Sequence, residues 1–327
     1  MDTVPGKFER KPVTHTIEQT RKKRDESDSE DEAPQQIDYN VPELKEWDPT
    51  TLPDHFFLVL EGKRRTGKST FAKWLLQYYQ NRFSIVWCMS NTKASGYWQE
   101  FVGDAFTFDS WYPSAVFRLI ERNDRIIKQY GEDSPAAKRL GSALIILDDV
   151  ISSRVHDDSM FLRLAVEGRH HLISVVLMTQ DPKAINPKVR DNADVAVIFN
   201  QKTFRNKETI WADFLNDTRK EVGFGLLSKY AVEHNALVAI QTNLNSNISR
   251  SFFKSTGDKT KLKDPEYMLG GEQQKEIIKK ERAERKIKKK KMAEDSQYAK
   301  EDTSEIKKFS TEILQSSGSH SFFPFIK

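Results

Sequence analysis

The chain has 327 residues, of which 37% are hydrophobic and 31% are charged, and this allows one large domain or two small ones. The formal net charge of +4 is too small for the overall balance to indicate a nucleic-acid partner. No apolar run approaches the roughly 20 residues needed to cross a bilayer, and no secretory signal is visible. We therefore expect an intracellular protein without a membrane span.

Residues 1–45 are predicted to form a disordered, charged N-terminal tail, because few apolar side chains are available there to offset the entropy of ordering. A basic run at 21–24 is followed by an acidic run at 25–32. Ser27 and Ser29 lie in the acidic run and are candidates for phosphorylation, and a solvated tail without that role is the simpler interpretation.

A phosphate-binding loop follows the first apolar strand, which is expected over residues 56–60. The loop matches G-x-x-x-x-G-K-[ST] and leads into a helical pattern, so its backbone N–H groups and the helix N-terminus would face one anion. Lys68 is expected to reach the β- and γ-phosphates of ATP, and the Ser69 hydroxyl is expected to ligate Mg²⁺. The predicted nucleotide-binding residues are Gly62, Lys63, Arg64, Arg65, Thr66, Gly67, Lys68, Ser69 and Thr70.

Apolar runs alternate with helical patterns over residues 46–256, which we expect to form one P-loop ATPase domain. The runs show no period-two alternation, as is typical of parallel strands that are buried on both faces. The predicted fold is α/β, a doubly wound and mostly parallel sheet with helices on both faces. Cys88, the one cysteine, lies in such a run, which indicates a core residue and a reducing compartment. After residues 56–60, strands are expected at 83–89, 143–147, 172–178, 195–199 and, as the closing strand, 236–240.

Two further strands end in polar residues that point to nucleotide chemistry. The run at 143–147 leads into Asp148, which would hold Mg²⁺, and Asp149, which would orient or deprotonate the attacking water. Alone this is an ordinary strand-to-turn pattern, but downstream of a phosphate loop it indicates a nucleotide site. Gln180 follows the run at 172–178, at the end of a strand where open α/β sheets bind ligands. The alternative is a turn before Pro182.

Residues 257–327 are predicted to form a charged C-terminal arm with an apolar end. From 272 to 294 most residues are charged, and the segment could be an exposed helix, a disordered arm or a basic arm that orders on a polyanion. We expect the lysines from Lys275 to Lys291 to grip DNA or another polyanion. The apolar residues 321–327 are typical of a segment that docks on a partner.

The order of these motifs resembles the FtsK/HerA superfamily of P-loop ATPases and, within it, the DNA-packaging ATPases of nucleocytoplasmic large DNA viruses and their relatives. The resemblance covers about residues 56–241 and rests on the phosphate loop and on the runs at 146–149, 168–171 and 177–180. It implies a hexameric ring that hydrolyses ATP with Mg²⁺ and threads double-stranded DNA, without sequence readout, into a preformed capsid. A capsid or portal-vertex protein would be its partner, in the host cytoplasm or nucleus at the site of virion assembly or in the virion.

The resemblance also implies roles for individual residues. The strand that ends in Gln180 would lie between the phosphate-loop strand and the carboxylate strand, so that Gln180 reads the γ-phosphate. An arginine of a neighbouring subunit would complete the site, and Arg169 matches best, with Arg190 second. Many members carry Asp-Glu where this chain has Asp-Asp, so Asp149 is one methylene shorter than their base. The catalytic residues are thus expected to be Lys68, Asp149, Gln180 and Arg169.

Three other functions share parts of this pattern. A HerA-type translocase or helicase would share the site but normally brings accessory domains. A P-loop kinase for a small molecule would need an arginine-rich lid, and no clear lid is visible between Asp149 and Gln180. A nucleotide-dependent assembly protein would bind ATP without turnover. DNA-stimulated hydrolysis would distinguish a motor from the last two.

Overall fold

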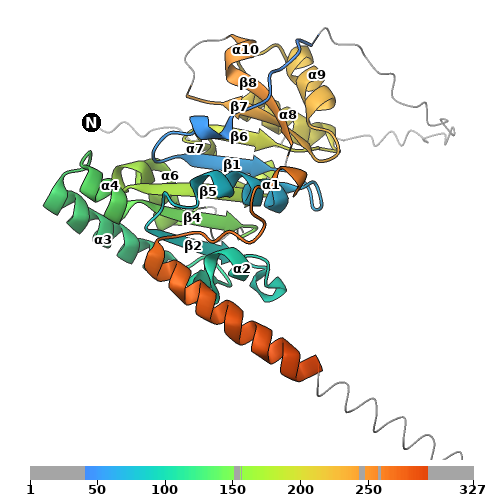
Figure 1. The fold of residues 1–327 in the computed structure, drawn as a ribbon. Helices are drawn as coiled ribbons and strands as arrows, with labels where there is room; N and C mark the ends of the chain where they lie inside the picture. Colours follow the sequence, from blue (N-terminus) through green and yellow to red (C-terminus); the bar gives the residue numbers. More distant parts are fainter. Residues whose placement is uncertain (1–40, 151–154, 156, 243–246, 257–258, 294–327) are drawn as a thin grey trace, which may run out of the picture. The chain divides into compact units, whose positions relative to one another are not determined.

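The computed structural model describes residues 41–293 except 151–154, 156, 243–246 and 257–258. The predicted tail with Ser27 and Ser29 therefore lies outside the described residues up to residue 40, as does the apolar C-terminal end. Figure 1 shows a sheet through the centre of the described domain with helices on both of its sides.

The sheet has eight strands in the order β3-β2-β4-β5-β1-β6-β7-β8. The pairs from β3 to β6 are parallel, and β7 and β8 add two antiparallel strands at one edge. This confirms the mostly parallel sheet, and the place of β5 between β4 and β1 confirms the expected neighbours of the strand that precedes Gln180. The strands are β1 (Phe57–Glu61), β2 (Ile85–Ser90), β3 (Thr107–Phe108), β4 (Ala143–Asp148), β5 (Ile173–Thr179), β6 (Val195–Ile198), β7 (Asn235–Ile240) and β8 (Phe252–Thr256).

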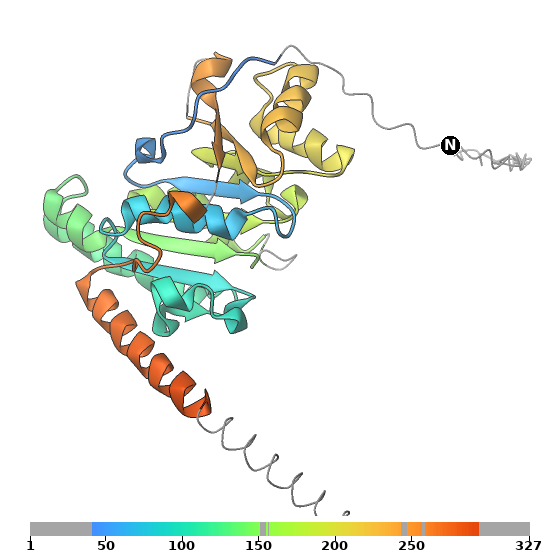
Figure 2. The ribbon, with the colours of Figure 1, turned by 45° about the vertical axis from the view of Figure 1, so that its right-hand side comes forward.

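Helices cover the two faces of the sheet and bury one hydrophobic cluster on each face, as a doubly wound fold requires. Helices α3, α6, α7, α8 and α9 pack on one face, and α1 and α2 pack on the other. Figure 2 shows the strands as arrows across the centre, with helices in front of and behind them. The helices are α1 (Lys68–Leu76), α2 (Gln99–Val102), α3 (Pro113–Tyr130), α4 (Pro135–Gly141), α6 (Ser159–Glu167), α7 (Pro187–Arg190), α8 (Phe204–Phe214), α9 (Lys220–Tyr230) and α10 (Ile248–Ser251), and short 3₁₀ turns lie at Pro49–Thr51, Gln77–Tyr79, Lys93–Ser95, Asp104–Phe106, Gly168–His171, Pro182–Ala184 and Lys259–Lys261.

The edges of the sheet differ from the expectation. The run at 236–240 is not the closing strand, because β8 pairs antiparallel with β7 outside it. Both β8 and the two-residue β3 lie at edges and lack the continuous apolar run that identifies the central strands. Cys88 in β2 is fully buried as expected, and burial raises the pKa of its thiol well above the usual value.

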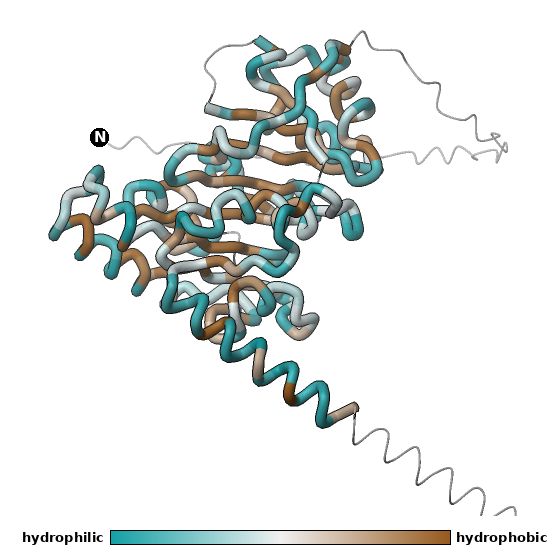
Figure 3. The backbone as a smooth tube through the Cα atoms, viewed as in Figure 1, coloured by the Kyte–Doolittle hydropathy of each residue, from teal (hydrophilic) through white to brown (hydrophobic). Residues whose placement is uncertain are grey.

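A helix spans residues 272–293, and its first half is fixed by hydrogen bonds of the Gln274 side chain with Val86 of β2 and Val102 of α2. Ile278 is fully buried, and the Glu281 carboxylate accepts a hydrogen bond of 2.7 Å from the backbone N–H of Asp104. Residues 286–293 are exposed, and Figure 3 shows this end of the helix as largely hydrophilic. Of the three forms left open for this segment, the structure shows a helix that is docked at its start and exposed at its end.

Candidate nucleotide-binding site

The phosphate loop connects the carboxyl end of β1 to the amino end of α1, as the motif predicts. A Cβ at Gly62 would approach the Phe199 Cβ to 2.7 Å, and Gly67 has a φ of +104°, so both positions require glycine. The Lys68 side chain is only 7% exposed, and its Nζ donates to the carbonyl oxygens of Gly62 at 2.5 Å and Lys63 at 3.1 Å. The ammonium group is thus held inside the curl of its own loop.

Asp148 ends β4 beside the loop and is held by a tryptophan. The Trp98 indole Nε1 donates a hydrogen bond of 2.8 Å to Asp148 Oδ2, and both side chains are buried. Burial raises the pKa of Asp148, and the Trp98 hydrogen bond and the charge of Lys68 act in the opposite direction. The sequence did not indicate Trp98, because tryptophan in an aromatic-rich segment is usually a packing residue.

Asp149, Gln180 and Arg64 form a chain of side-chain contacts across the site. Gln180 Nε2 donates to Asp149 Oδ2, and Arg64 Nε donates to Gln180 Oε1 at 3.1 Å. Asp149 has a φ of 54°, and Asn91 Nδ2 donates to its carbonyl oxygen at 2.7 Å, which fixes the turn after β4. The structure therefore brings together residues from the phosphate loop and from the ends of β4 and β5.

These residues line one cavity of about 1010 Å³ at the carboxyl ends of the parallel strands. It is large enough for a nucleotide, since ligand pockets usually measure roughly 300–1,000 Å³. The sequence did not predict the contribution of the β7 side, where Glu233 and His234 lie before the strand. The lining residues are Arg64, Arg65, Thr66, Gly67, Lys68, Ser69, Thr70, Thr92, Asp148, Asp149, Gln180, Glu233, His234, Asn235 and Thr256.

Charge around Lys68 is balanced by carboxylates from several directions. Burial lowers the pKa of Lys68, and the charges of Asp149, Asp148 and Glu61 act to raise it. Glu61 is fully buried, and neither of its carboxylate oxygens has a hydrogen-bond partner among the described residues. Burial raises the pKa of Glu61 well above its usual value, and the charge of Lys68 acts in the opposite direction.

The donor set fits a magnesium ion that is held chiefly by a nucleotide. Ser69 and Asp148 face the same cavity, and hydroxyl and carboxylate oxygens are ligands that Mg²⁺ accepts. Among the described residues, no group of three or more His, Cys, Asp or Glu side chains is arranged to hold a metal. Mg²⁺ in phosphate-transfer sites needs only one or two protein ligands, because phosphates and water supply the others.

The two candidate arginines have different surroundings. Arg169 lies before β5, at the amino end of that strand, whereas the cavity lies at the carboxyl ends. Its Nη1 is 3.9 Å from Asp194 Oδ1. Its side chain is 46% exposed. The Arg190 side chain is 10% exposed, lies 3.0 Å from Asp213 Oδ2 and donates to two backbone carbonyls. Arg190 is thus engaged by residues of its own chain, and Arg169 is far more accessible.

The sheet order, the loop and the strand-end carboxylates define a P-loop nucleotide-binding protein. No helix among the described residues is both long and apolar enough to span a bilayer. The sequence model of the poxvirus A32 protein family matches residues 46–222, which is more than half of the chain. The chain therefore belongs to the family of the poxvirus A32 protein, and this confirms the resemblance to the packaging ATPases of large DNA viruses.

Individual viral proteins and solved structures resemble this chain at low sequence identity. An uncharacterised protein of Acanthamoeba polyphaga mimivirus is 23% identical over 206 residues, which are 62% of this chain and 72% of that protein. An uncharacterised protein of Frog virus 3 is 24% identical, and the match spans half of each chain. The genome packaging NTPase B204 of Sulfolobus turreted icosahedral virus 2, solved with ATP-gammaS, is 14% identical over 62% of this chain and 98% of that chain, with a TM-score of 0.41. The pCW3 conjugation coupling protein TcpA is 12% identical over 69% of this chain and 73% of that chain, with a TM-score of 0.47.

Proposed function

We propose that this protein is an ATP-hydrolysing motor subunit that packages double-stranded viral DNA into a capsid. The observation that carries the proposal is the single cavity in which Lys68, Ser69, Asp148, Asp149 and Gln180 meet, in a chain of the poxvirus A32 family. A ring of subunits, with six as the expected number, would convert hydrolysis into movement along DNA phosphates. A capsid or portal-vertex protein would anchor it.

In the proposed reaction, the γ-phosphate of ATP lies between the phosphate loop and the ends of β4 and β5. The Lys68 ammonium stabilises negative charge on the phosphoryl oxygens, and Asp149 orients the attacking water and accepts its proton. Mg²⁺ bound by Ser69 and Asp148 would neutralise charge on the β- and γ-phosphates. Gln180 contacts both Arg64 and Asp149, so a phosphate entering there would alter both contacts at once.

This reaction is tested by separating nucleotide binding from turnover. Lys68→Ala should weaken both, because the loop loses its cation. Asp149→Asn should bind ATP normally and hydrolyse it about 10²-fold more slowly or worse, the scale of losing a positioned base. Asp109→Asn, an exposed aspartate outside the cavity, is the matched control. Near-normal phosphate release by Asp149→Asn would contradict the assignment of the base.

The motor function needs two more measurements. Hydrolysis should rise when double-stranded DNA is added, and the protein should form rings when ATP and DNA are both present. A HerA-type translocase would behave in the same way, so packaging itself must be tested with empty capsids. Hydrolysis that DNA does not stimulate would favour the kinase or the assembly protein instead.

A further inference from the structure

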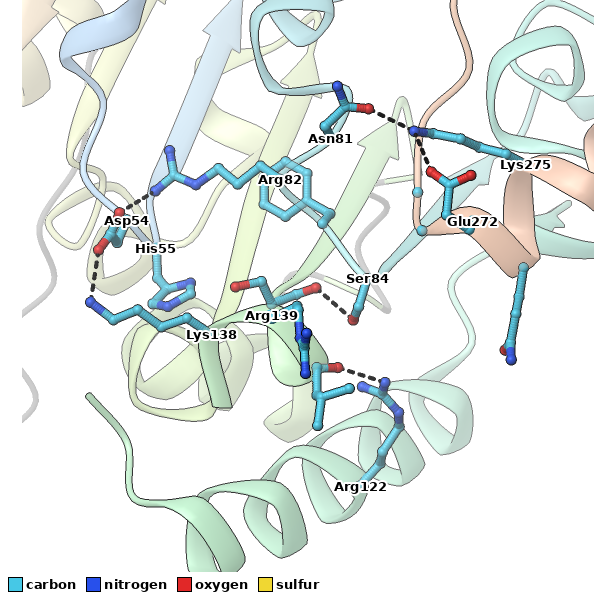
Figure 4. Close-up of a pocket in the computed structure, with 16 residues that line it drawn as sticks. Asp54, His55, Asn81, Arg82, Ser84, Arg122, Lys138, Arg139, Glu272 and Lys275 are labelled. Carbon is cyan, nitrogen blue, oxygen red and sulfur yellow. Dashed lines mark hydrogen bonds and ion pairs between the residues drawn. The ribbon is translucent and has the colours of Figure 1, made fainter. Parts of the chain in front are cut away.

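A second cavity, of about 690 Å³, lies at the amino ends of the parallel strands, whereas the nucleotide cavity lies at their carboxyl ends. Three of its residues, His55, Ser84 and Ser142, come directly before or within two residues of β1, β2 and β4. They mark the amino ends of these parallel strands. Figure 4 shows this second cavity and the side chains around it.

The second cavity is strongly basic. Two carboxylates, Asp54 and Glu272, face a larger set of cations. His55 adds no charge at neutral pH, because burial lowers its pKa to about 4. The hydrogen bond from Lys138 lowers the pKa of Asp54, so the Asp54 carboxylate is one of the two negative charges at the cavity. The cationic side chains that line the cavity are Arg82, Arg122, Lys138, Arg139 and Lys275.

Backbone carbonyl groups orient two of these cations, Arg82 and Arg122, and Arg82 is also paired with the Asp54 carboxylate. Arg82 Nη2 donates to the Pro53 carbonyl oxygen at 2.8 Å as well as to Asp54. Arg122 Nη2 donates to the Leu140 carbonyl oxygen at 2.8 Å. Positive charge that is preorganised in this way loses less rotamer entropy when an anion binds.

Lys138 and Arg139 leave the cavity open to anions. Lys138 contacts only one oxygen of Asp54, at 3.1 Å. Arg139 is exposed, and its side chain makes no hydrogen bond or ion pair with another described residue. A guanidinium group without a carboxylate partner is free to present its planar fork of donors to a phosphate.

The helix of residues 272–293 begins at this cavity and adds to its positive potential. Gly271 is held against the sheet by a 3.2 Å hydrogen bond from its N–H to the Ser84 carbonyl oxygen. Glu272 and Gln273 in the first turn line the cavity, so the positive end of the helix dipole faces it. Lys275, predicted as part of an exposed basic arm, donates instead to Asn81 Oδ1 at 2.7 Å inside the cavity.

We infer that this basic cavity is a second anion site, separate from the phosphate loop, which binds phosphates of the nucleic-acid backbone. Guanidinium and ammonium groups together, in a pocket larger than a single ion needs, match a short run of backbone phosphates. The inference rests on the proposed function for the identity of the polyanion. Part of the DNA contact that we predicted for the lysines from Lys275 to Lys291 would then be made by residues of the ATPase domain.

The test is the salt dependence of DNA binding by the full chain. Binding of a labelled blunt DNA duplex is measured by fluorescence anisotropy over a series of KCl concentrations. The double variant Lys138→Ala/Arg139→Ala should bind about tenfold more weakly, and its log–log slope should fall by about 1 to 2, since each lost phosphate contact removes about 0.9. Arg139→Ala alone breaks no hydrogen bond or ion pair of that side chain with another described residue, and it should lower the slope by about 1.

The matched control is Arg118→Ala/Arg125→Ala, which removes two exposed arginines of α3 outside the cavity. A slope unchanged in the pocket variants, or lowered equally in the control, would overturn the inference. Weaker binding of a poly-glutamate chain with unchanged duplex binding would also overturn it, because the cavity would then take an acidic protein segment.

Measuring ATP hydrolysis in the absence of DNA tests the proposed function independently of this inference. The pocket variants should hydrolyse ATP at the wild-type basal rate, because Lys138 and Arg139 line the cavity at the amino ends of the strands, whereas the nucleotide cavity lies at their carboxyl ends. Their stimulation by DNA should be reduced. Absence of hydrolysis in the wild-type chain would refute the ATPase and leave the DNA-binding measurement intact.

Discussion

The indole N–H of Trp98 donates a 2.8 Å hydrogen bond to Asp148, the carboxylate that ends β4 beside the phosphate loop. The two residues are 50 positions apart in the sequence, and the contact forms only because β2 and β4 are neighbours. The bond fixes the Oδ2 oxygen of this carboxylate. It also opposes the rise in the pKa of Asp148 that burial causes.

Trp98→Phe should keep most of the packing and remove this hydrogen bond. We expect ATP hydrolysis to fall by about tenfold and to need more Mg²⁺, as is usual when the partner of a metal ligand is lost. The pKa of Asp148 should rise, so the acidic limb of the pH–rate profile should move to higher pH. Trp74→Phe is the control, since Trp74 is buried in the same cluster and its Nε1 has no partner among the described residues. If the pH–rate profile of Trp98→Phe equals that of Trp74→Phe, the hydrogen bond from Trp98 does not control Asp148 in the reaction.

Arg169 is proposed to act on the site of a neighbouring subunit. The seven-residue β5 separates it from Gln180 in its own subunit, a span of about 20 Å at roughly 3.3 Å per residue. Arg169→Ala should bind ATP and assemble, but hydrolyse about 10³-fold more slowly or worse. Mixing it with Lys68→Ala subunits should restore part of the activity, because some interfaces then combine an intact loop with an intact arginine.

The control for this mixing experiment is Arg163→Ala, an arginine of α6 that pairs with Glu167 at the surface. It should hydrolyse ATP normally without mixing. Mixed rings that form and show no recovery would mean that Arg169 acts within its own subunit or is structural. Arg190 would then be the next candidate, although its contacts with Asp213 predict that its removal also destabilises the fold.

His55 should make the stability of the fold depend on pH. Burial lowers its pKa from the ordinary 6.5 to about 4, and its ring nitrogens are buried without hydrogen-bond partners among the described residues. Between these values the unfolded chain binds more protons, so the contribution of His55 is complete above about pH 6.5 and is lost as the pH falls toward about 4. His55→Gln should therefore show a smaller loss of unfolding free energy over that window in urea titrations. His170→Gln, at an exposed histidine, should follow the wild type.

Gln274 completes the edge of β2 at Val86, because the two-residue β3 pairs with β2 only at Cys88 and Met89. Its side-chain Oε1 accepts from the Val86 N–H at 2.9 Å, and its Nε2 donates to the carbonyl oxygens of Val86 and Val102. Gln274→Ala would leave these buried groups unpaired and should cost about 3 kcal/mol of unfolding free energy, at about 1–3 kcal/mol for each such group. Gln273→Ala, at the exposed neighbouring position, should change stability by less than about 0.5 kcal/mol. Equal effects of the two substitutions would contradict the role of Gln274.

The sequence by itself determined the phosphate loop, the central strands and the carboxylates at the end of β4. Their signals are local: Gly67 needs a positive φ, the buried strands need continuous apolar runs, and the motif needs Lys68 next to a helix start. Such features depend on residues that are close in the chain. They can be recognised without knowing how the strands are ordered.

Only the tertiary structure decided which distant residues complete these features. Gln274 lies 188 residues from Val86, and Trp98 lies 50 residues from Asp148, so neither contact follows from spacing or periodicity. The basic cavity likewise collects cations from four separate segments, although the charges of the whole chain almost balance. Contacts of this kind depend on strand order and on side-chain packing, because residues far apart in the chain meet only when the sheet has formed.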